Sequence, residues 1–203
     1  MIPAAWTAET LGAGADDRSD EAEVAALARG EDQALSRLIR RWQRRLFAFA
    51  YRYLQNETDA ADLVAETFVK LHQQRGRLVS DTNLPAWLFT VLANLCRSRL
   101  RWAKRHPTDA LDLARERETL PSELPGPASA LQAQERTGAL QEAIADLPHD
   151  LKATLLLHHY EQLSYRKIAA ITGCTERGVE TRLYRARQRL RDVLGPQFLD
   201  SAS

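Results

Sequence analysis

The chain has 203 residues, of which 44% are hydrophobic and 27% charged, and its formal net charge at pH 7 is +1. This length allows one large or two small domains. No apolar run approaches the roughly 20 residues that cross a bilayer, so no membrane insertion is expected. The N-terminal residues lack the basic start and apolar stretch of a secretory signal. Cys96 and Cys174 are expected to be reduced, buried thiols of a cytoplasmic protein.

Helical periodicity predicts four helices in the first half of the chain. They are expected at residues 20–30, 32–54, 56–74 and 84–105, with a loop at 75–83. Asp20 is placed to cap the first of these helices and Gly30 to end it. Asn56 or Thr58 caps the third, and Pro85 is tolerated in the first turn of the fourth.

The pattern changes at residues 106–129, where four prolines and an excess of acid over base mark a linker. Fully extended, these 24 residues span about 80 Å, more than two turns of duplex DNA at roughly 34 Å per turn. The predicted fold class is all-α, with two small helical domains joined by this flexible Pro-rich linker. The predicted segments are an acidic disordered tail at 1–20, a first domain at 21–105, the linker at 106–129, a second domain at 130–195 and a short tail at 196–203.

Four short helices are predicted after the linker, at 130–147, 148–162, 163–172 and from Thr175 onward. Pro148 opens the second of them and Ser164 caps the third. Gly173 ends that third helix and Thr175 caps the last, so a three-residue turn containing glycine joins the two. This is the sequence signature of a helix-turn-helix.

The last helix combines a narrow apolar seam with a basic outer face. The seam consists of Val179, Leu183, Ala186 and Leu190, which are expected to dock on the preceding helix through residues that include Ile168 and Ile171. A DNA-recognition helix needs this arrangement, in which Arg grips guanine, Glu accepts from cytosine and further arginines neutralise phosphates. A basic helix that serves solubility or RNA contact would have a similar composition.

Charge is also asymmetric along the chain. Residues 1–33 carry eight acidic residues against two arginines, residues 97–105 carry five basic residues and no acid, and residues 165–191 carry eight basic residues against two acids. Two basic patches in a near-neutral chain indicate a polyanion that is contacted at two places, although two solvated helix faces would give the same charge pattern.

The helix predicted at 84–105 mixes aromatic with basic residues, among them Trp87, Phe89 and Trp102. Unstacked bases of single-stranded DNA pack on aromatic rings while arginines follow the backbone. A core aromatic stripe has the same spacing. Asn94 lies in an otherwise apolar segment, where it lowers helix propensity, and either a specific contact or a structural hydrogen bond explains it.

Three segments together resemble the extracytoplasmic-function group of bacterial sigma factors, the smallest members of the sigma-70 family. "DAADLVAETFVKLH" (59–72) is similar to the family's core-binding segment, and "PAWLFTVLANLCRSRLR" (85–101) to the segment that melts and reads the −10 element. The stretch 147–191 resembles the −35-binding domain almost throughout.

The resemblance implies a protein without catalytic activity, cofactor or metal that directs core RNA polymerase to promoter DNA and assists duplex opening. It implies contact with the β and β′ subunits through Asp59, Asp62, Leu63, Glu66 and Phe68. It implies −10 DNA binding through Trp87, Asn94, Arg97 and Arg101. It implies −35 DNA binding through Arg166, Arg177, Glu180, Thr181, Arg182, Tyr184 and Arg185. An anti-sigma factor that masks these faces is a further expected partner.

The sequence departs from the family pattern at three positions. The family usually has Glu where Ala61 stands and Gln where Ala65 stands, so the contact with polymerase is weaker or arranged differently. It commonly has Lys or Arg where Glu180 stands. Glu180 either accepts from cytosine or holds Arg177 or Tyr184 in place, and the −35 sequence that is read is expected to differ accordingly.

Two other classes of protein compete with this interpretation. A helix-turn-helix regulator that binds duplex DNA without polymerase would lack the segments at 59–72 and 84–105. For a metalloprotein the candidates are His149, His158, His159 and Asp150, but adjacent histidines on a helix point about 100° apart and do not easily share an ion. The sequence also holds no nucleophile elbow, P-loop or paired-carboxylate pattern.

Overall fold

The computed structural model describes residues 17–78, 82–106 and 138–195, and these ranges are helical with no strand. The helices are α1 (Asp17–Ala28), α2 (Asp32–Leu54), α3 (Glu57–Gln73), α4 (Leu84–Arg105), α7 (His149–His159), α8 (Tyr165–Thr172) and α9 (Glu176–Leu194), with a one-turn 3₁₀ helix η3 (Arg75–Arg77). Residues 138–145 form a further helical segment. The all-α prediction is confirmed. No helix among the described residues is long and apolar enough to cross a membrane.

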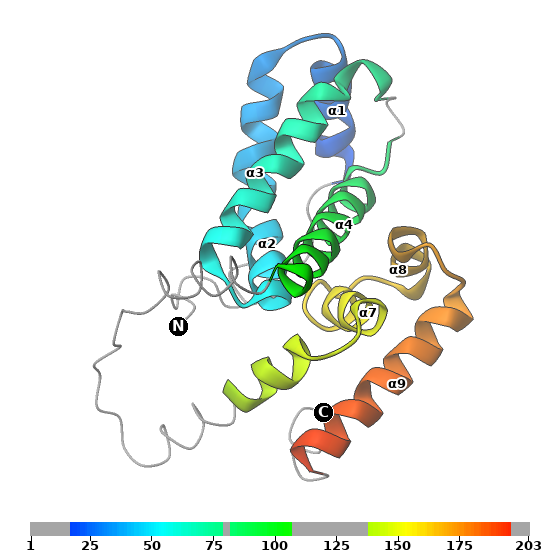
Figure 1. The fold of residues 1–203 in the computed structure, drawn as a ribbon. Helices are drawn as coiled ribbons and strands as arrows, with labels where there is room; N and C mark the ends of the chain where they lie inside the picture. Colours follow the sequence, from blue (N-terminus) through cyan, green and yellow to red (C-terminus); the bar gives the residue numbers. More distant parts are fainter. Residues whose placement is uncertain (1–16, 79–81, 107–137, 196–203) are drawn as a thin grey trace, which may run out of the picture.

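Two lobes make up the described molecule (Figure 1). The first lobe contains α1 to α4, and the second contains residues 138–145 with α7, α8 and α9. The tails predicted at 1–20 and 196–203 lie mostly or entirely outside the described residues, as does the predicted linker after His106.

Aromatic side chains fill the core of the first lobe, where α2 packs against α3 and α4. Trp42, Phe49 and Tyr53 recur on one face of α2 and are at most 1% exposed. Phe89 of α4 meets the rings of Phe49 and Trp42 edge to face, at centroid distances of 5.4 and 6.3 Å. Edge-to-face packing of this kind adds to the free energy gained by burial.

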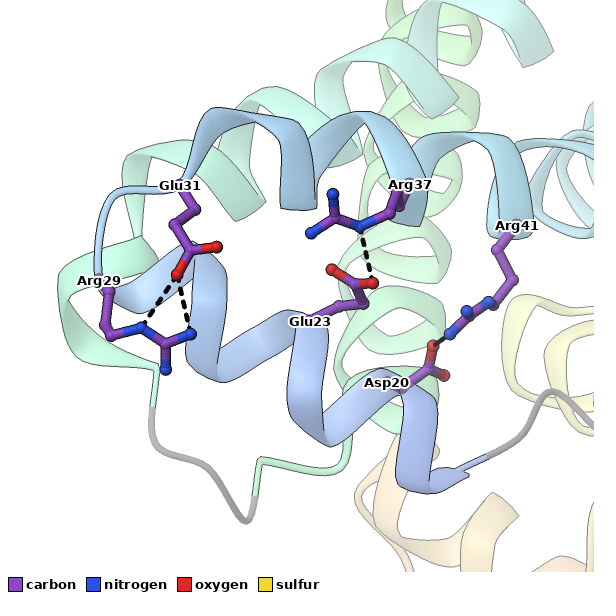
Figure 2. Close-up of polar contacts among 6 residues, drawn as sticks. All are labelled: Asp20, Glu23, Arg29, Glu31, Arg37 and Arg41. Carbon is purple, nitrogen blue, oxygen red and sulfur yellow. Dashed lines mark hydrogen bonds and ion pairs between the residues drawn. The ribbon is translucent and has the colours of Figure 1, made fainter.

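Helix α1 starts earlier than its predicted cap, so the assignment of Asp20 as an N-cap is wrong. Helix α1 begins at Asp17, and Asp20 lies inside it, 2% exposed. Its Oδ1 accepts a hydrogen bond from Arg41 Nη1 at 2.5 Å (Figure 2). The same oxygen accepts from Trp42 Nε1 at 3.3 Å. Glu23 pairs with Arg37 at 2.7 Å one turn away. Contacts with α2 therefore determine the role of Asp20, and the sequence around Asp20 does not predict these contacts.

The short connections between helices are built as the sequence predicts. Asn56 caps α3 by accepting from the amide of Asp59, and Thr58 does not take this role. Ser164 caps α8, Gly173 ends it with a left-handed φ of +64°, and Thr175 caps α9 by accepting from Gly178 N at 3.0 Å. A left-handed φ suits glycine, which has no Cβ to clash. The helix-turn-helix is thus present.

Candidate protein and nucleic-acid interfaces

An apolar groove of about 830 Å³ runs between α2 and α3 on the first lobe. Its apolar lining is Leu35, Ile39 and Phe47 from α2 with Ala61, Val64, Ala65, Phe68 and Val69 from α3. Val69 is 52% exposed, whereas Phe68 is only 6% exposed at the base. A rim of polar side chains, including Gln43 and Arg44, borders it. Rimmed apolar grooves of this kind mark sites where a protein partner docks.

Of the five residues predicted to contact polymerase, only Phe68 lines this groove. Phe68 lies in it as expected for a protein-binding residue, and Asp62 and Glu66 are exposed on the same helix. Leu63 is half-buried and lies outside the groove lining. The wall formed by α2 was not predicted, although Leu35, Ile39 and Phe47 widen the apolar stripe of α2 beyond what its core packing needs.

Asp59 does not belong to the exposed acidic face that the sequence predicts. Its carboxylate pairs with the guanidinium of Arg99 on α4, and its side chain is 12% exposed. The same guanidinium lies 5.4 Å from the ring centroid of Trp102. Asp59 thus connects α3 to the basic end of α4, because Arg99 reaches across the gap between the two helices.

The aromatic residues of α4 divide between core and surface. Phe89 is fully buried, so for this residue the core interpretation is right. Trp87 and Trp102 are half-buried. Trp102 stacks on His106 with centroids 4.8 Å apart and an angle of 20° between the rings. Only Trp87 and Trp102 therefore have ring surface available to a ligand.

Asn94, Arg97 and Arg101 project from an exposed face of α4. The side chain of Asn94 makes no hydrogen bond with any residue in the described part of the chain. A structural hydrogen bond within the described ranges therefore does not explain why an asparagine stands in this apolar segment, and its amide is available to an external partner.

Helix α9 is held by its seam and exposes the rest of its surface. Val179, Leu183, Ala186 and Leu190 are all at most 4% exposed, as predicted. The opposite face carries the exposed side chains of Arg177, Glu180, Thr181, Tyr184 and Arg185, and Tyr184 is 63% exposed. Arg166 is exposed on the neighbouring helix α8.

The polar side chains on α9 differ in what they contact within the protein. Glu180 has no hydrogen bond or ion pair to a described residue, so it does not hold Arg177 or Tyr184. Arg182 lies 3.5 Å from the carboxylate of Asp150 on α7. The hydroxyl of Thr181 donates to the carbonyl of Arg177 at 2.9 Å. Glu180 is therefore an acidic group on the outer face of α9 that is available to a ligand.

The histidines considered as metal ligands pack against separate aromatic rings. His158 lies 5.5 Å from the ring of Tyr165, and His159 lies 5.1 Å from that of Tyr160. Burial lowers the pKa of His158. Within residues 17–78, 82–106 and 138–195, no group of three or more His, Cys, Asp or Glu side chains is placed to hold a metal ion.

Comparison with known proteins connects these interfaces to one family. The family model for sigma-70 region 2 matches residues 38–106, and that for sigma-70 region 4 matches residues 137–190. The chain is 26% identical over 182 residues to the RNA polymerase sigma-H factor of Pseudomonas aeruginosa, covering 87% of this chain and 94% of that protein. It is 27% identical over 187 residues to the ECF RNA polymerase sigma-E factor of Haemophilus influenzae, covering 90% and 98%.

Two solved structures share the fold. CnrH, solved in complex with the cytosolic domain of CnrY, gives a TM-score of 0.64 at 26% identity, covering 87% of this chain and 97% of the other. The sigma factor RpoE of Bartonella quintana, solved in complex with the anti-sigma factor NepR, gives a TM-score of 0.58 at 28% identity, covering 79% and 96%. The two matched regions occur in order and together cover more than half of the sequence. The chain therefore belongs to the sigma-70 family, as an alternative sigma factor of the extracytoplasmic-function group.

Proposed function

We propose that this chain binds core RNA polymerase in the cytoplasm, brings it to specific promoters and helps to open the duplex, without catalysing a reaction itself. One observation supports this most strongly: a single chain carries an apolar protein-binding groove and two separate exposed basic helix faces. A regulator that bound duplex DNA alone would have no need of the groove or of the α4 face.

Core polymerase is proposed to bind along α3 and the adjoining groove. Phe68 offers an apolar contact, and the exposed carboxylates of Asp62 and Glu66 lie on the same helix. Ala61 and Ala65 are exposed and line the groove. Their short side chains leave room for a large apolar side chain from a helix of the β′ subunit, which gives these departures from the family pattern a physical role.

The −10 element is proposed to bind α4. The free amide of Asn94 is able to hydrogen-bond a base that has left the stack, while Arg97 and Arg101 neutralise nearby phosphates. Trp87 offers part of its ring for stacking. This assignment does not include Asp59 among polymerase contacts, because its carboxylate is already engaged by Arg99.

The −35 element is proposed to bind the outer face of α9 in the major groove. Arg177, Tyr184 and Arg185 flank Glu180 on this face. Since the Glu180 carboxylate accepts but cannot donate, it favours a cytosine N4 amine over the acceptors of guanine. Arg166, which is exposed on α8, is proposed to contact phosphate, and Arg182 is proposed to do so once it leaves Asp150.

An inhibitor protein is the remaining proposed partner. NepR is an anti-sigma factor by name, and it was solved bound to a sigma factor of the same fold. An inhibitory protein that occupied the groove between α2 and α3 would compete directly with polymerase for this chain.

Run-off transcription with core polymerase on a library of promoter sequences tests the proposal. We expect the chain to produce transcripts from a subset of promoters whose −35 elements share a cytosine-containing step. Asn94→Ala should reduce permanganate-reactive thymines at −10 while it leaves binding to core unchanged. Absence of promoter-specific transcripts under any condition in which the chain binds core would contradict the proposal.

A further inference from the structure

The two lobes touch through a buried polar contact. Arg45 on α2 donates from Nε and Nη2 to Oε2 of Glu161 at 3.1 and 2.9 Å. The two side chains are 16% and 2% exposed. Next to them, the guanidinium of Arg52 lies 4.1 Å from the ring centroid of Tyr160. Two charge-assisted hydrogen bonds from one guanidinium to a single desolvated carboxylate oxygen restrict the relative orientation of the two elements that carry them.

The turn that presents Glu161 is strained. Gln162, the next residue, has a φ of +50°, a left-handed conformation that is unfavourable for a residue with a side chain. The amide of Leu163 returns to the carbonyl of Leu157 at 3.2 Å and closes the turn. Unfavourable backbone conformations persist where the surrounding structure enforces them. Here the turn directs Glu161 toward the first lobe.

Other features of the same contact oppose closure. Oε1 of Glu161 and Nη1 of Arg52 are buried with no hydrogen-bond partner in the described residues. Burial, and repulsion by basic residues that include Arg97 of α4, lower the pKa of His149 on α7 to about 4. Burial, together with Lys104 of α4, lowers the pKa of Lys152 to about 8, although Asp146 acts in the opposite direction. The unpaired buried atoms and the positive charges near Lys152 make the closed contact costly to form, although Lys152 Nζ also donates to the carbonyl of Tyr53 across it at 3.4 Å.

The closed arrangement cannot place both DNA-binding helices on one promoter. Helix α4 packs on α8, with Thr90 Oγ1 3.5 Å from the carbonyl of Ile171. Packed helices have axes roughly 8–10 Å apart, and α9 follows α8 after a three-residue turn. The −10 and −35 elements are separated by roughly 25 base pairs, or roughly 80 Å at about 34 Å per turn. The lobes must therefore separate before both elements are bound.

We propose that the Arg45–Glu161 pair is an autoinhibitory latch, which holds the free chain closed and must break before the chain engages polymerase and promoter DNA. The consequence for transcription rests on the proposed function, whereas the latch itself is a property of the free protein. A buried ion pair adds little net stability but is expensive to leave half-made, so loss of either partner should release the lobes.

Energy transfer between the lobes of the free, full-length chain tests the latch. Thr58→Cys on α3 and Val193→Cys on α9 place dyes at exposed positions, in a Cys174→Ser background. Cys96 stays unlabelled, because burial raises the pKa of its thiol. Glu161→Ala should lower the transfer efficiency. Glu142→Ala removes an exposed carboxylate from the same lobe and should leave the efficiency at the wild-type level.

Further variants guard against a misfolded Glu161→Ala protein. Arg45→Gln should open the lobes by itself, and Arg45→Glu combined with Glu161→Arg should recover part of the lost efficiency. Wild-type efficiency in both single variants would overturn the latch. Opening in either single variant without any recovery in the charge-swapped protein would also count against a specific pair.

Transcription at limiting core polymerase then measures the consequence. If nine-tenths of the free chain is closed, opening it lowers the half-maximal core concentration about tenfold. No shift in this concentration for an opened variant would contradict autoinhibition. If Glu161→Ala leaves the transfer efficiency unchanged while the chain still supports promoter-specific transcription, the latch is disproved and the proposed function stands. If Glu161→Ala opens the lobes as expected but the chain never supports transcription, the latch stands and the proposed function is disproved.

Discussion

Helices α4 and α9 are both basic, both face outward in part, and use their charges differently. On α9, a seam of four residues holds the helix, and most of the remaining side chains face solvent. On α4, the buried residues pack against α1, α2, α3 and α8, and basic residues near its end also contact other residues of the protein. Arg99 pairs with Asp59, and Arg97 lies close enough to His149 to lower its pKa.

This difference determines how well the role of each side chain is predicted from the sequence of its helix. When one narrow seam fixes a helix, the outward residues follow from the 3.6-residue period alone. When a helix has several partners, the same period leaves several roles for each side chain. The basic residues of α9 are therefore assigned to DNA with few alternatives, whereas each residue of α4 needs its contacts to be known.

Phe89→Ala should give the largest effect and shows that α4 is partly a core element. Its fully buried ring packs on Phe49 and Trp42, so its loss should lower the free energy of unfolding by about 3–5 kcal/mol. Urea denaturation followed by circular dichroism measures this change. Trp87→Ala, two residues earlier and half-buried, is the matched control and should be clearly milder. Equal losses would mean that both rings belong to the core.

Glu180→Lys should alter what α9 reads without altering how α9 folds. The exposed carboxylate has no partner among the described residues, so the unfolding free energy should stay within about 0.5 kcal/mol. Discrimination between −35 bases should change by about 1–3 kcal/mol, since one base contact is replaced. Competition among −35 variants for the holoenzyme measures it. Glu176→Lys on the same helix controls for charge; if both variants raise affinity equally for every −35 sequence, Glu180 does not read a base.

Acid should weaken the structure around α4 and α7. Burial and Arg97 lower the pKa of His149 to about 4, from an ordinary value near 6.5. As the pH falls from about 6.5 to about 4, the unfolded chain binds a proton at this residue that the folded chain excludes, so the free energy of unfolding falls. Denaturation midpoints at pH 7 and pH 5 should differ less in His149→Gln than in wild type. The comparison isolates His149, because Glu161, whose pKa burial raises, contributes equally to both proteins and with the opposite sign.

Asp59→Asn should give the smallest effect and separates a structural carboxylate from an exposed one. Its pair with Arg99 is partly exposed, so the loss of stability should be under about 1 kcal/mol. Asp62→Asn, on the next turn of α3 and exposed, should leave thermal stability unchanged and should weaken binding to core polymerase instead. If Asp59→Asn weakened core binding as much as Asp62→Asn without loss of stability, Asp59 would be a polymerase contact after all.

The sequence predicts the helices and the helix-turn-helix well, because these depend on local signals. Caps, periodic seams and a glycine turn place α8 and α9 to within a few residues. Long-range pairs were not predictable in this way. Asp20 was predicted to cap α1, but it is hydrogen-bonded by Arg41 and Trp42 of α2 instead. The pair between Arg45 and Glu161 joins residues 116 positions apart in the sequence. The α2 wall of the groove was also not predicted, because the groove forms only where α2 and α3 pack together.

DNase footprinting of a promoter with the chain alone, with core polymerase alone and with both tests the account most directly. The two DNA-binding helices lie on lobes that are closed together in the free chain, and polymerase is expected to hold the lobes apart. We therefore predict protection that spans the −35 and −10 elements when both proteins are present, and little protection with either alone. Strong protection of a promoter by the chain without polymerase would contradict the account and would indicate an ordinary DNA-binding regulator.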